Sequence, residues 1–283
     1  MADSGDAPPV RPRYVRQVEN TETFQIPIEA AEIYEKKFVP AIFAEWAPHI
    51  IEAARVKPGN RVLDVACGTG VVARTAAGIV GPEGEVVGVD LNQAMLTVAS
   101  RVRPDLAWRQ GAVDDLPFDG DSFDAAVCQM AFMFFPDRSH AFSELGRVTR
   151  PGGRVAVVVP AALDDQPAYR QFVDIAAHHA GDEARALLST YWSCGDLDAL
   201  VATMTGAGIE LDDARTKTGT ARFDSAEDLV ETEVEGSPLA DRITPDAYSA
   251  IRRDVAAEMA AYSTPHGTFE IPLVCHVVAG LIG

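Results

Sequence analysis

Short apolar runs alternate with segments of helical periodicity through the middle of the chain. The run ending at Val65 predicts a buried strand over residues 61–66, and the apolar spacing from Gly70 predicts a helix over residues 70–80. The same alternation then predicts strands over 85–90, 106–110, 123–130 and 154–159, with helices over 93–101 and 138–149. Strands and helices that alternate through short connections form a mainly parallel sheet covered on both faces. The pattern therefore predicts an α/β fold.

The segments on either side of this alternation have a different pattern. Residues 1–22 are rich in Pro, Arg, Asp and Thr and predict a flexible N-terminal arm, whereas residues 23–58 have helical spacing that Pro40 should kink or split. Later in the chain the pattern predicts mainly helices, interrupted by strands over 209–223 and 269–281. Helical blocks inserted late in an α/β chain usually pack over the ligand edge of the sheet. We therefore expect the late helices to form a lid.

Composition and charge limit the partners that the chain can have. The chain has 24 basic and 42 acidic residues, a formal net charge of −18 that disfavours nucleic acid and anionic membrane surfaces. Its four cysteines are far apart in sequence, so neither a disulfide framework nor a zinc site is expected. No signal-peptide pattern or apolar run of roughly 20 residues is present. We expect a cytoplasmic monomer or homodimer that acts on a small molecule.

A glycine turn at Gly68 and Gly70 joins the first strand of the alternation to its first helix. This order of elements brings backbone N–H groups and a helix N-terminus close to a bound ligand. Two interpretations compete. With Asp90 twenty residues past Gly70, the turn matches a dinucleotide-binding pattern. Alternatively, Asp64, Gly68 and Gly70 form one motif, D-x-A-x-G-x-G, which is followed by Asp90 and by Leu-Pro-Phe at residues 116–118.

The second interpretation extends over a series of motifs in a fixed order. They are VLDVACGTG, VVGVDLNQAML, GAVDDLPFDGDSFDAAVCQ, FFPDR and LGRVTRPGG, all within about residues 60–160. In these motifs the chain resembles the class I S-adenosylmethionine-dependent methyltransferases, and among them it is similar to the UbiE-like small-molecule group. The resemblance implies a Rossmann-like, doubly wound sheet of seven mainly parallel strands, the last antiparallel, with a lid of N-terminal and inserted helices.

The resemblance also implies one methyltransferase domain over residues 23–283. Its expected parts are cap helices over 23–58, a cofactor-binding core over 59–160, lid insertions over 161–194 and 225–268, and remaining core over 195–224 and 269–283. S-adenosylmethionine would be the cofactor and S-adenosylhomocysteine the product. The implied cofactor-binding residues are Asp64, Ala66, Gly68, Gly70, Asp90, Leu91, Met95, Ala112, Val113, Asp114 and Gln129.

Most of these implied contacts also have a physical reason. Asp64 would hold the cationic amino group of the cofactor, together with the backbone of the glycine turn. Asp90 would accept both ribose hydroxyls in charge-assisted hydrogen bonds. Leu91 and Met95 would line the face of the adenine, and the backbone carbonyl of Gln129 would contact the methionyl amine.

The adenine side of the site leaves alternatives open. Val113 and Asp114 would approach the adenine edge. Ala112 stands where UbiE-like proteins usually place an aspartate against the adenine amine, so that Asp114 or the backbone would serve instead. Asp114 could equally belong to a solvated loop, and Asp90 could cap the helix that begins near Asn92.

The acceptor side has candidate side chains but no diagnostic motif. Methyl transfer from a sulfonium is an in-line displacement, and it needs a base only when the acceptor carries a proton of high pKa. His179 is the candidate base, with helix packing as the alternative, and Tyr34 is the candidate aromatic residue beside the sulfonium, with core packing as the alternative. No metal site is expected, because the histidines are dispersed. Residues 132–135 would form an apolar acceptor wall, and weaker candidates are Tyr169, Tyr191, Trp192 and His266.

These observations predict an S-adenosylmethionine-dependent methyltransferase, of enzyme class EC 2.1.1.-, that methylates O, N or C of a small, largely apolar metabolite. One alternative is an NAD-dependent oxidoreductase that uses the same glycine turn. Another is a protein of this fold that binds the cofactor without transferring methyl, as a cyclase or an interaction module.

Overall fold

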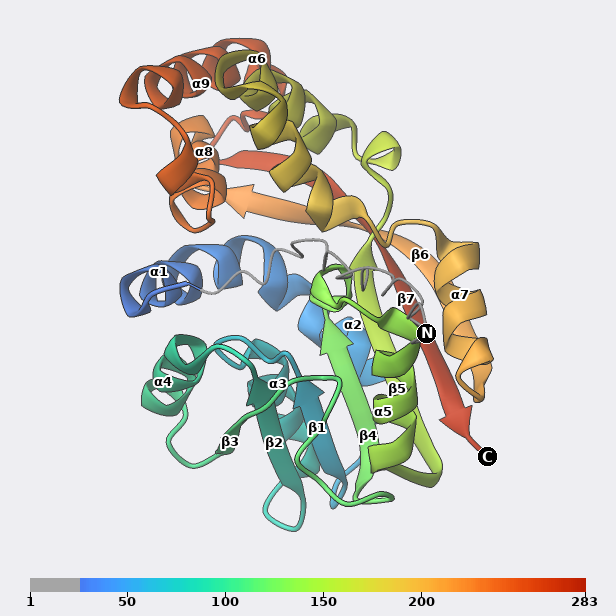
Figure 1. The fold of residues 1–283 in the computed structure, drawn as a ribbon. Helices are drawn as coiled ribbons and strands as arrows, with labels where there is room; N and C mark the ends of the chain where they lie inside the picture. Colours follow the sequence, from blue (N-terminus) through green and yellow to red (C-terminus); the bar gives the residue numbers. More distant parts are fainter. Residues whose placement is uncertain (1–25) are drawn as a thin grey trace, which may run out of the picture.

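Seven strands form one sheet in the order β3-β2-β1-β4-β5-β7-β6 (Figure 1). A computed structural model describes residues 26–283, so the arm predicted over residues 1–22 lies outside the described part of the chain. The strands are β1 Arg61–Val65, β2 Glu85–Asp90, β3 Ala107–Gln110, β4 Phe123–Gln129, β5 Thr149–Pro160, β6 Ile209–Phe223 and β7 Phe269–Ile282. Strands β1 to β5 pair in parallel, and β7 is antiparallel to both of its neighbours. The predicted fold class is confirmed.

The helices are α1 Ile28–Ile33, α2 Ala44–Ala53, α3 Val71–Val80, α4 Gln93–Val102, α5 Arg138–Val148, α6 Pro167–Ser189, α7 Leu197–Gly206, α8 Ala226–Glu235 and α9 Pro245–Glu258. A π-helix, η1 Tyr34–Phe43, joins α1 to α2, and short 3₁₀ segments are η2 Phe132–Phe134, η3 Leu163–Asp165, η4 Thr190–Trp192, η5 Ala240–Arg242 and η6 Ala260–Tyr262. Within residues 26–283, no helix combines the length and the apolar character needed to cross a membrane.

The N-terminal helix continues through Pro40 as a π-helix, a form that the sequence did not predict. Pro40 lies inside η1, where the wider π-helical turn continues the helix past a residue that has no N–H to donate. The helix α6 is interrupted instead at Gly181, whose φ of 79° is left-handed. The sequence pattern located these helices but not the form of either irregularity.

The core lies on both faces of the sheet, because successive strand residues point to opposite sides. Val62 packs in the cluster that contains α2 and α3, whereas Leu63 packs in the cluster that contains α5 and α7. In β5, Val158 belongs to the first cluster and Val157 to the second. This double burial explains why the β5 sequence is apolar at consecutive positions.

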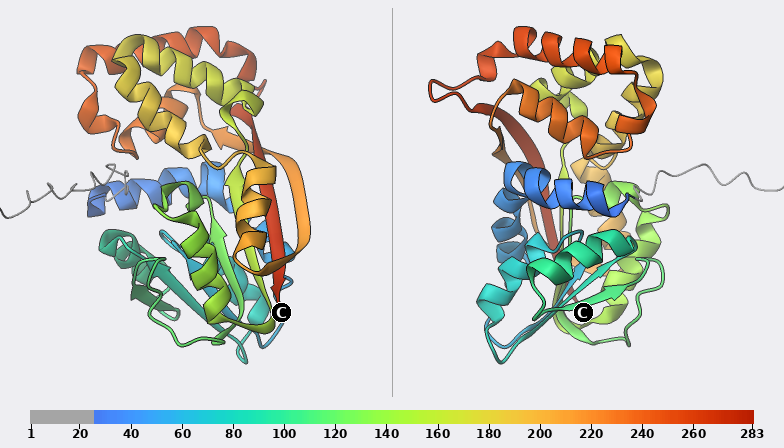
Figure 2. Two further views of the ribbon diagram at one scale, coloured as in Figure 1. Left: turned by 45° about the vertical axis from the view of Figure 1, so that its right-hand side comes forward. Right: turned by 90° about the vertical axis from the view of Figure 1, so that its left-hand side faces the viewer.

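A two-stranded extension of the sheet carries the late helices. Residues 275–281 of β7 pair with β5, but residues 269–274 pair only with β6, so the two long strands continue beyond the sheet. Helices α6, α8 and α9 lie together around this extension, above the carboxyl ends of the parallel strands, with α1 and η1 between them and the sheet (Figures 1 and 2). Gln166 fixes the start of α6 there, because its amide donates to the Val274 carbonyl at 2.6 Å and accepts from the Val274 N–H at 3.0 Å.

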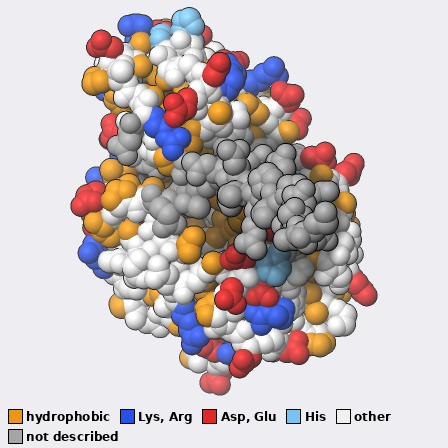
Figure 3. All heavy atoms as spheres, in the orientation of Figure 1, with side chains coloured by type: hydrophobic (Ala, Val, Ile, Leu, Met, Phe, Trp, Pro, Cys, Tyr) orange, Lys and Arg blue, Asp and Glu red, His pale blue; other side chains and the backbone are white. Residues whose placement is uncertain are grey.

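Charged side chains are spread over the surface. Figure 3 shows acidic and basic side chains interspersed on one face of the molecule, around the atoms drawn in grey. Many of them form ion pairs at the surface, such as Arg101 with Glu32 at 2.6 Å. The described part of this face therefore presents no continuous basic patch to a polyanion.

We expect Gly88→Ala to lower the free energy of unfolding by about 1–3 kcal/mol, because its side chain has no room. A Cβ at Gly88 would lie 2.5 Å from the Trp108 ring and 2.9 Å from the Cys67 sulfur. Gly78→Ala is the matched control, since a Cβ there meets nothing within 4 Å and alanine favours the helix by about 0.5–1 kcal/mol. Urea denaturation of both variants measures the difference, and equal stabilities would contradict this packing.

Candidate functional site

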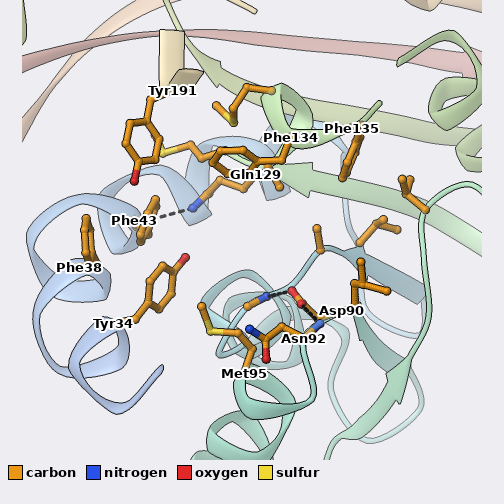
Figure 4. A pocket seen from close by; sticks show the side chains of 18 of the residues that line it. Tyr34, Phe38, Phe43, Asp90, Asn92, Met95, Gln129, Phe134, Phe135 and Tyr191 are labelled. Carbon is orange, nitrogen blue, oxygen red and sulfur yellow. Dashed lines mark hydrogen bonds between the residues drawn. The ribbon is translucent and has the colours of Figure 1, made fainter. Parts of the chain in front are cut away.

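A cavity of about 390 Å³ lies between the carboxyl ends of the parallel strands, the N-terminal helices and the late helices. Its floor comes from the ends of β1, β2 and β4, one side from Ile26 and η1, and its roof from α6, η4, α8 and β7. Figure 4 shows Asp90, Asn92 and Met95 on the floor, Tyr34, Phe38 and Phe43 on the side, and Phe134 and Tyr191 opposite the floor. The cavity therefore joins segments that are far apart in the sequence.

Asp90 is the fixed carboxylate of the floor. One of its oxygens accepts the Gly68 N–H at 2.8 Å, and the other accepts the Asn92 N–H at 2.8 Å. Asp90 lines the cavity, and each oxygen can accept a second hydrogen bond, as binding of two vicinal hydroxyls requires. Burial raises the pKa of this carboxyl, and the two backbone N–H groups oppose that rise.

Asp90 is not the cap of the following helix. Asn92 is the N-cap of α4, because its side chain accepts the Ala94 N–H at 2.8 Å. The other end of the Asn92 amide donates to the Ile26 carbonyl at 3.0 Å and so ties the N-terminal segment to this loop. Asn92, and not Asp90, therefore caps the helix.

Asp64 lies one layer below the cavity. It is 1% exposed and does not line the cavity, and its Oδ2 accepts the Ala73 N–H at 2.8 Å. Burial raises the pKa of Asp64 to about 7, with a smaller contribution in the same direction from Asp90. A nearby cation would lower this pKa again and favour the ionised carboxylate.

The two glycines of the turn have different environments. Gly68 lines the cavity with a φ of 55°, and a Cβ there would lie 3.4 Å from the Tyr34 hydroxyl. Gly70 does not line the cavity; it is the left-handed N-cap of α3, and a Cβ there would lie 2.2 Å from the Trp108 ring. Packing against β3 thus requires glycine at position 70. At position 68, glycine leaves no side chain between the backbone and a ligand in the cavity.

Two non-glycine residues with left-handed backbone line the cavity at strand ends. Ala66 follows β1 with a φ of 53°, and Met130 follows β4 with a φ of 51°. Such conformations cost free energy and cluster at functional sites. In this chain they turn the backbone sharply where β1 and β4 end at the floor of the cavity.

Gln129 places an unsatisfied polar atom at the cavity. Its Nε2 donates to the Phe43 carbonyl at 3.0 Å, a bond drawn in Figure 4, and its buried Oε1 has no hydrogen-bond partner within residues 26–283. A buried acceptor without a partner is destabilising unless a ligand or water satisfies it. The side-chain oxygen, and not only the backbone predicted from the resemblance, is therefore available to a ligand donor.

The side of the cavity next to β2 and β3 is apolar with one exposed carboxylate. Leu91 and Met95 line it, and Leu91 is 47% exposed, which is unusual for a residue of its size. Ala112, Val113 and Asp114 line the same side. Asp114 is exposed, and its backbone carbonyl accepts from His140 Nε2 at 2.9 Å, so this contact fixes the loop.

Tyr34 lies in an aromatic cluster over the glycine turn. Its ring stacks on Phe43 with centroids 5.1 Å apart and lies 5.6 Å from Phe38. Burial and the nearby acidic groups, first among them Asp90, hold the pKa of the Tyr34 hydroxyl far above its usual range. The hydroxyl therefore keeps its proton and acts as a donor rather than as a base.

The helix that carries Tyr34 is held over the turn by polar contacts. Arg74 of α3 donates to the Thr69 carbonyl at 2.6 Å and to Glu35 at 3.0 Å. Together with the bonds that Asn92 and Gln129 make, this contact joins the N-terminal helices to three different strand ends of the floor. No motif in the sequence predicted these links.

His179 lies outside the cavity lining. Its Nε2 is 2.6 Å from Asp254 Oδ2, in a contact that joins α6 to α9. This placement corresponds to the helix-packing alternative. His266 also does not line the cavity, whereas Tyr169, Tyr191 and Trp192 line its roof.

Glu233 is a functional candidate that sequence reasoning missed. It lines the roof and is 5% exposed. The many acidic residues of α8 would instead predict a solvent-exposed helix. The spacing of Glu233 from Leu229 and Val230 places it on the buried face of α8. Helical periodicity was therefore the signal that could have identified it.

No group of three or more His, Cys, Asp or Glu side chains is arranged to hold a metal within residues 26–283. The cavity lining includes three acidic side chains, Asp90, Asp114 and Glu233, and the described residues add no Lys, Arg or His to it. An anionic, largely apolar cavity favours a ligand that carries positive charge.

Comparisons with known proteins agree with this arrangement. Residues 63–157 match the family model described as a methyltransferase domain. Over 119 residues, the chain is 39% identical to the 2-phytyl-1,4-naphtoquinone methyltransferase of Synechococcus elongatus, covering 40% of this chain and 51% of that protein. It is 38% identical over 119 residues to the ubiquinone/menaquinone biosynthesis C-methyltransferase UbiE of Ectopseudomonas mendocina, covering 40% and 46%. The chain thus spans about half the length of these relatives.

The fold comparison extends over more of the chain. The crystal structure of the YcgJ protein of Bacillus subtilis superposes with a TM-score of 0.56 at 22% identity, covering 84% of this chain and 97% of that one. At this identity the likeness concerns the fold. The sequence matches identify residues 63–157 as a methyltransferase domain, the predicted family, whose methyl donor is S-adenosylmethionine.

We expect Asp64 to make the stability of the protein fall as pH rises. Its pKa is about 7 in the folded state against an ordinary value of 3.8, so the folded state holds the proton more tightly. This contribution is fully present below about pH 4 and is lost as pH rises through about 7. Asp64→Asn should match the wild type near pH 4 and be more stable by about 2–4 kcal/mol at pH 8. Urea denaturation at both pH values measures this, and a constant difference would contradict the assignment.

We expect His179→Ala to lower the free energy of unfolding by about 1 kcal/mol, because it removes a half-buried contact with Asp254. Cofactor affinity, measured by calorimetric titration with S-adenosylhomocysteine, should stay within about twofold of the wild type. A large loss of affinity without a loss of stability would place His179 in the site after all.

Proposed function

We propose that this chain, whose core is a class I S-adenosylmethionine-dependent methyltransferase domain, transfers a methyl group to a small, flat, largely apolar acceptor. The observation that carries the proposal is one cavity with two unlike ends. The floor carries the Asp90 carboxylate, the backbone of Gly68 and the Gln129 Oε1, which has no hydrogen-bond partner among the described residues. The roof is lined by aromatic side chains. These two ends suit a polar cationic cofactor and an apolar acceptor.

The residues of the floor fit the cofactor group by group. Asp90 would bind the ribose hydroxyls through its two oxygens, and the exposed Leu91 with Met95 would cover the adenine. The Gln129 Oε1 and the turn at Gly68 would hold the amino acid part. When bound, the cofactor supplies an electrophilic methyl group on a positively charged sulfur.

The remaining residues of the site orient the reactants and exclude water. The Tyr34 hydroxyl, which keeps its proton, lies over Gly68 and would donate a hydrogen bond to the bound amino acid part. The rings of Phe38 and Phe43 close that side of the cavity. Holding both reactants in line in a closed, dry cavity supplies much of the rate of a displacement.

The acceptor class follows from the aromatic lining and from the relatives. The roof and its surroundings present many rings to the cavity: Phe134, Phe135, Tyr169, Tyr191 and Trp192. Flat ring compounds bind well between such side chains. The relatives that match the core are named for methylation in quinone biosynthesis, which supports an aromatic acceptor of quinone type here.

The dinucleotide alternative fits the site less well. It would place a pyrophosphate at the N-terminus of α3. In the described structure, residues 69–71 do not line the cavity, and the Trp108 ring packs against Gly70. Acidic side chains in the lining would also repel two phosphates.

We expect Asp90→Ala to weaken S-adenosylhomocysteine binding by about 10- to 100-fold, because both ribose hydroxyls lose a charged acceptor. Asp115→Ala is the matched control, since it removes an exposed carboxylate that is not part of the cavity lining and should change the affinity by less than about threefold. Calorimetric titration measures both variants.

The same titrations test the proposed function itself. Binding of S-adenosylhomocysteine and none of NADH is the expected result for the wild type. Wild-type protein that binds NADH but not S-adenosylhomocysteine would overturn the function, and unchanged affinity in Asp90→Ala would overturn the role of Asp90 alone.

A further inference from the structure

A buried carboxyl group lies in the roof of the cavity, on the acceptor side. Glu233 of α8 is 5% exposed and lines the cavity together with Tyr169, Tyr191 and Trp192. Glutamate is rarely this buried without an ion pair. Among the described residues, Glu233 has no cationic partner, since the nearby Lys37 binds Asp228 and Glu231 on the same helix. A partner is therefore to be sought in the ligand.

Tyr169 of α6 controls the state of this carboxyl. Burial raises the pKa of Glu233 to about 7, and the neighbouring Tyr169 hydroxyl opposes that rise. The Tyr169 ring is 3% exposed and packs on Trp192 with centroids 4.9 Å apart, which fixes its direction. Its own pKa is held well above the usual range by burial first and by Glu233 next, so it remains a donor.

Other groups near this pair do not compete for a proton near neutral pH. Cys275 of β7 and Tyr191 of η4 make smaller contributions that raise the pKa of Tyr169. Burial raises the pKa of the Cys275 thiol itself. The described lining of the cavity contains no histidine or lysine. Asp90 and Asp114, the other acidic side chains of the lining, lie on the floor and on the side next to β3. Glu233 is thus the carboxyl of the roof.

We propose that Glu233 is the general base that removes the hydroxyl proton of the methyl acceptor, and that the acceptor is a hydroxylated aromatic compound. This inference rests on the proposed function and names the substrate class of the same site. A base whose proton affinity lies near the working pH is the most effective. Aromatic side chains around the carboxyl select a ring, and the carboxyl selects a ring that carries a hydroxyl.

The proton and the electrons balance in this step. The O–H bond of the acceptor breaks, its proton goes to the Glu233 carboxylate, and the electron pair remains on the acceptor. That pair forms the new bond to the methyl carbon, from the oxygen or from the ring carbon next to it, while the pair of the broken carbon–sulfur bond stays on sulfur. If the ring carbon is methylated, it then loses its own hydrogen as a proton, and the ring becomes aromatic again.

Binding of 2-naphthol and naphthalene in the presence of S-adenosylhomocysteine tests the inference without turnover. Ionised Glu233 accepts a hydrogen bond from the naphthol hydroxyl, so the wild type should prefer 2-naphthol by about tenfold above pH 7 and by less at pH 6. In Glu233→Gln this preference should lose its pH dependence. Glu235→Gln is the matched control, because Glu235 is on the same helix but binds Tyr248 at the surface, and it should behave as the wild type.

A second variant tests the partner of the carboxyl. Tyr169→Phe removes the hydroxyl that lowers the pKa of Glu233, so the pH midpoint of the naphthol preference should rise. A preference for naphthol that stays pH-dependent in Glu233→Gln would overturn the inference, as would failure of the wild type to bind 2-naphthol. Loss of S-adenosylhomocysteine binding by the wild type is a separate readout and would overturn the proposed function instead.

Discussion

The hydrogen bond from the Gly68 N–H to the Asp90 carboxylate is the contact on which the site depends. It joins the turn after β1 to the end of β2, and the second Asp90 oxygen joins the same point to the start of α4. Because burial makes the charged carboxylate costly, these two donors oppose the rise in its pKa and orient it beside the cavity. The polar end of the cavity is thereby built before any ligand arrives, which lowers the entropic cost of binding.

The sequence predicted most of the sheet and most of the floor, because both depend on local patterns. Apolar alternation located the seven strands, and the D-x-A-x-G-x-G motif with Asp90 located the carboxylate and the turn. The roles of single residues were harder to predict, because they depend on distant neighbours. Gly70 is required by Trp108 of β3, and Asp64 lies beneath the cavity, although both belong to the motif.

The roof was not predictable in the same way, since it is assembled from segments without a motif. The π-helix around Pro40, the extension of β6 and β7, and the burial of Glu233 all follow from long-range packing. Helices α6 and α8 both pack on α9 beside this extension, and Tyr169 of α6 and Glu233 of α8 both line the cavity. A shared floor with a variable roof explains how a chain can match relatives through its core alone.

A crystal structure of the protein with S-adenosylhomocysteine bound is the most direct test of this account. The account predicts that the ribose hydroxyls bind the two Asp90 oxygens, that the amino acid part lies between Gly68 and Gln129, and that the sulfur faces the aromatic roof. Electron density for the ligand along the N-terminus of α3, with Asp90 out of contact, would contradict it.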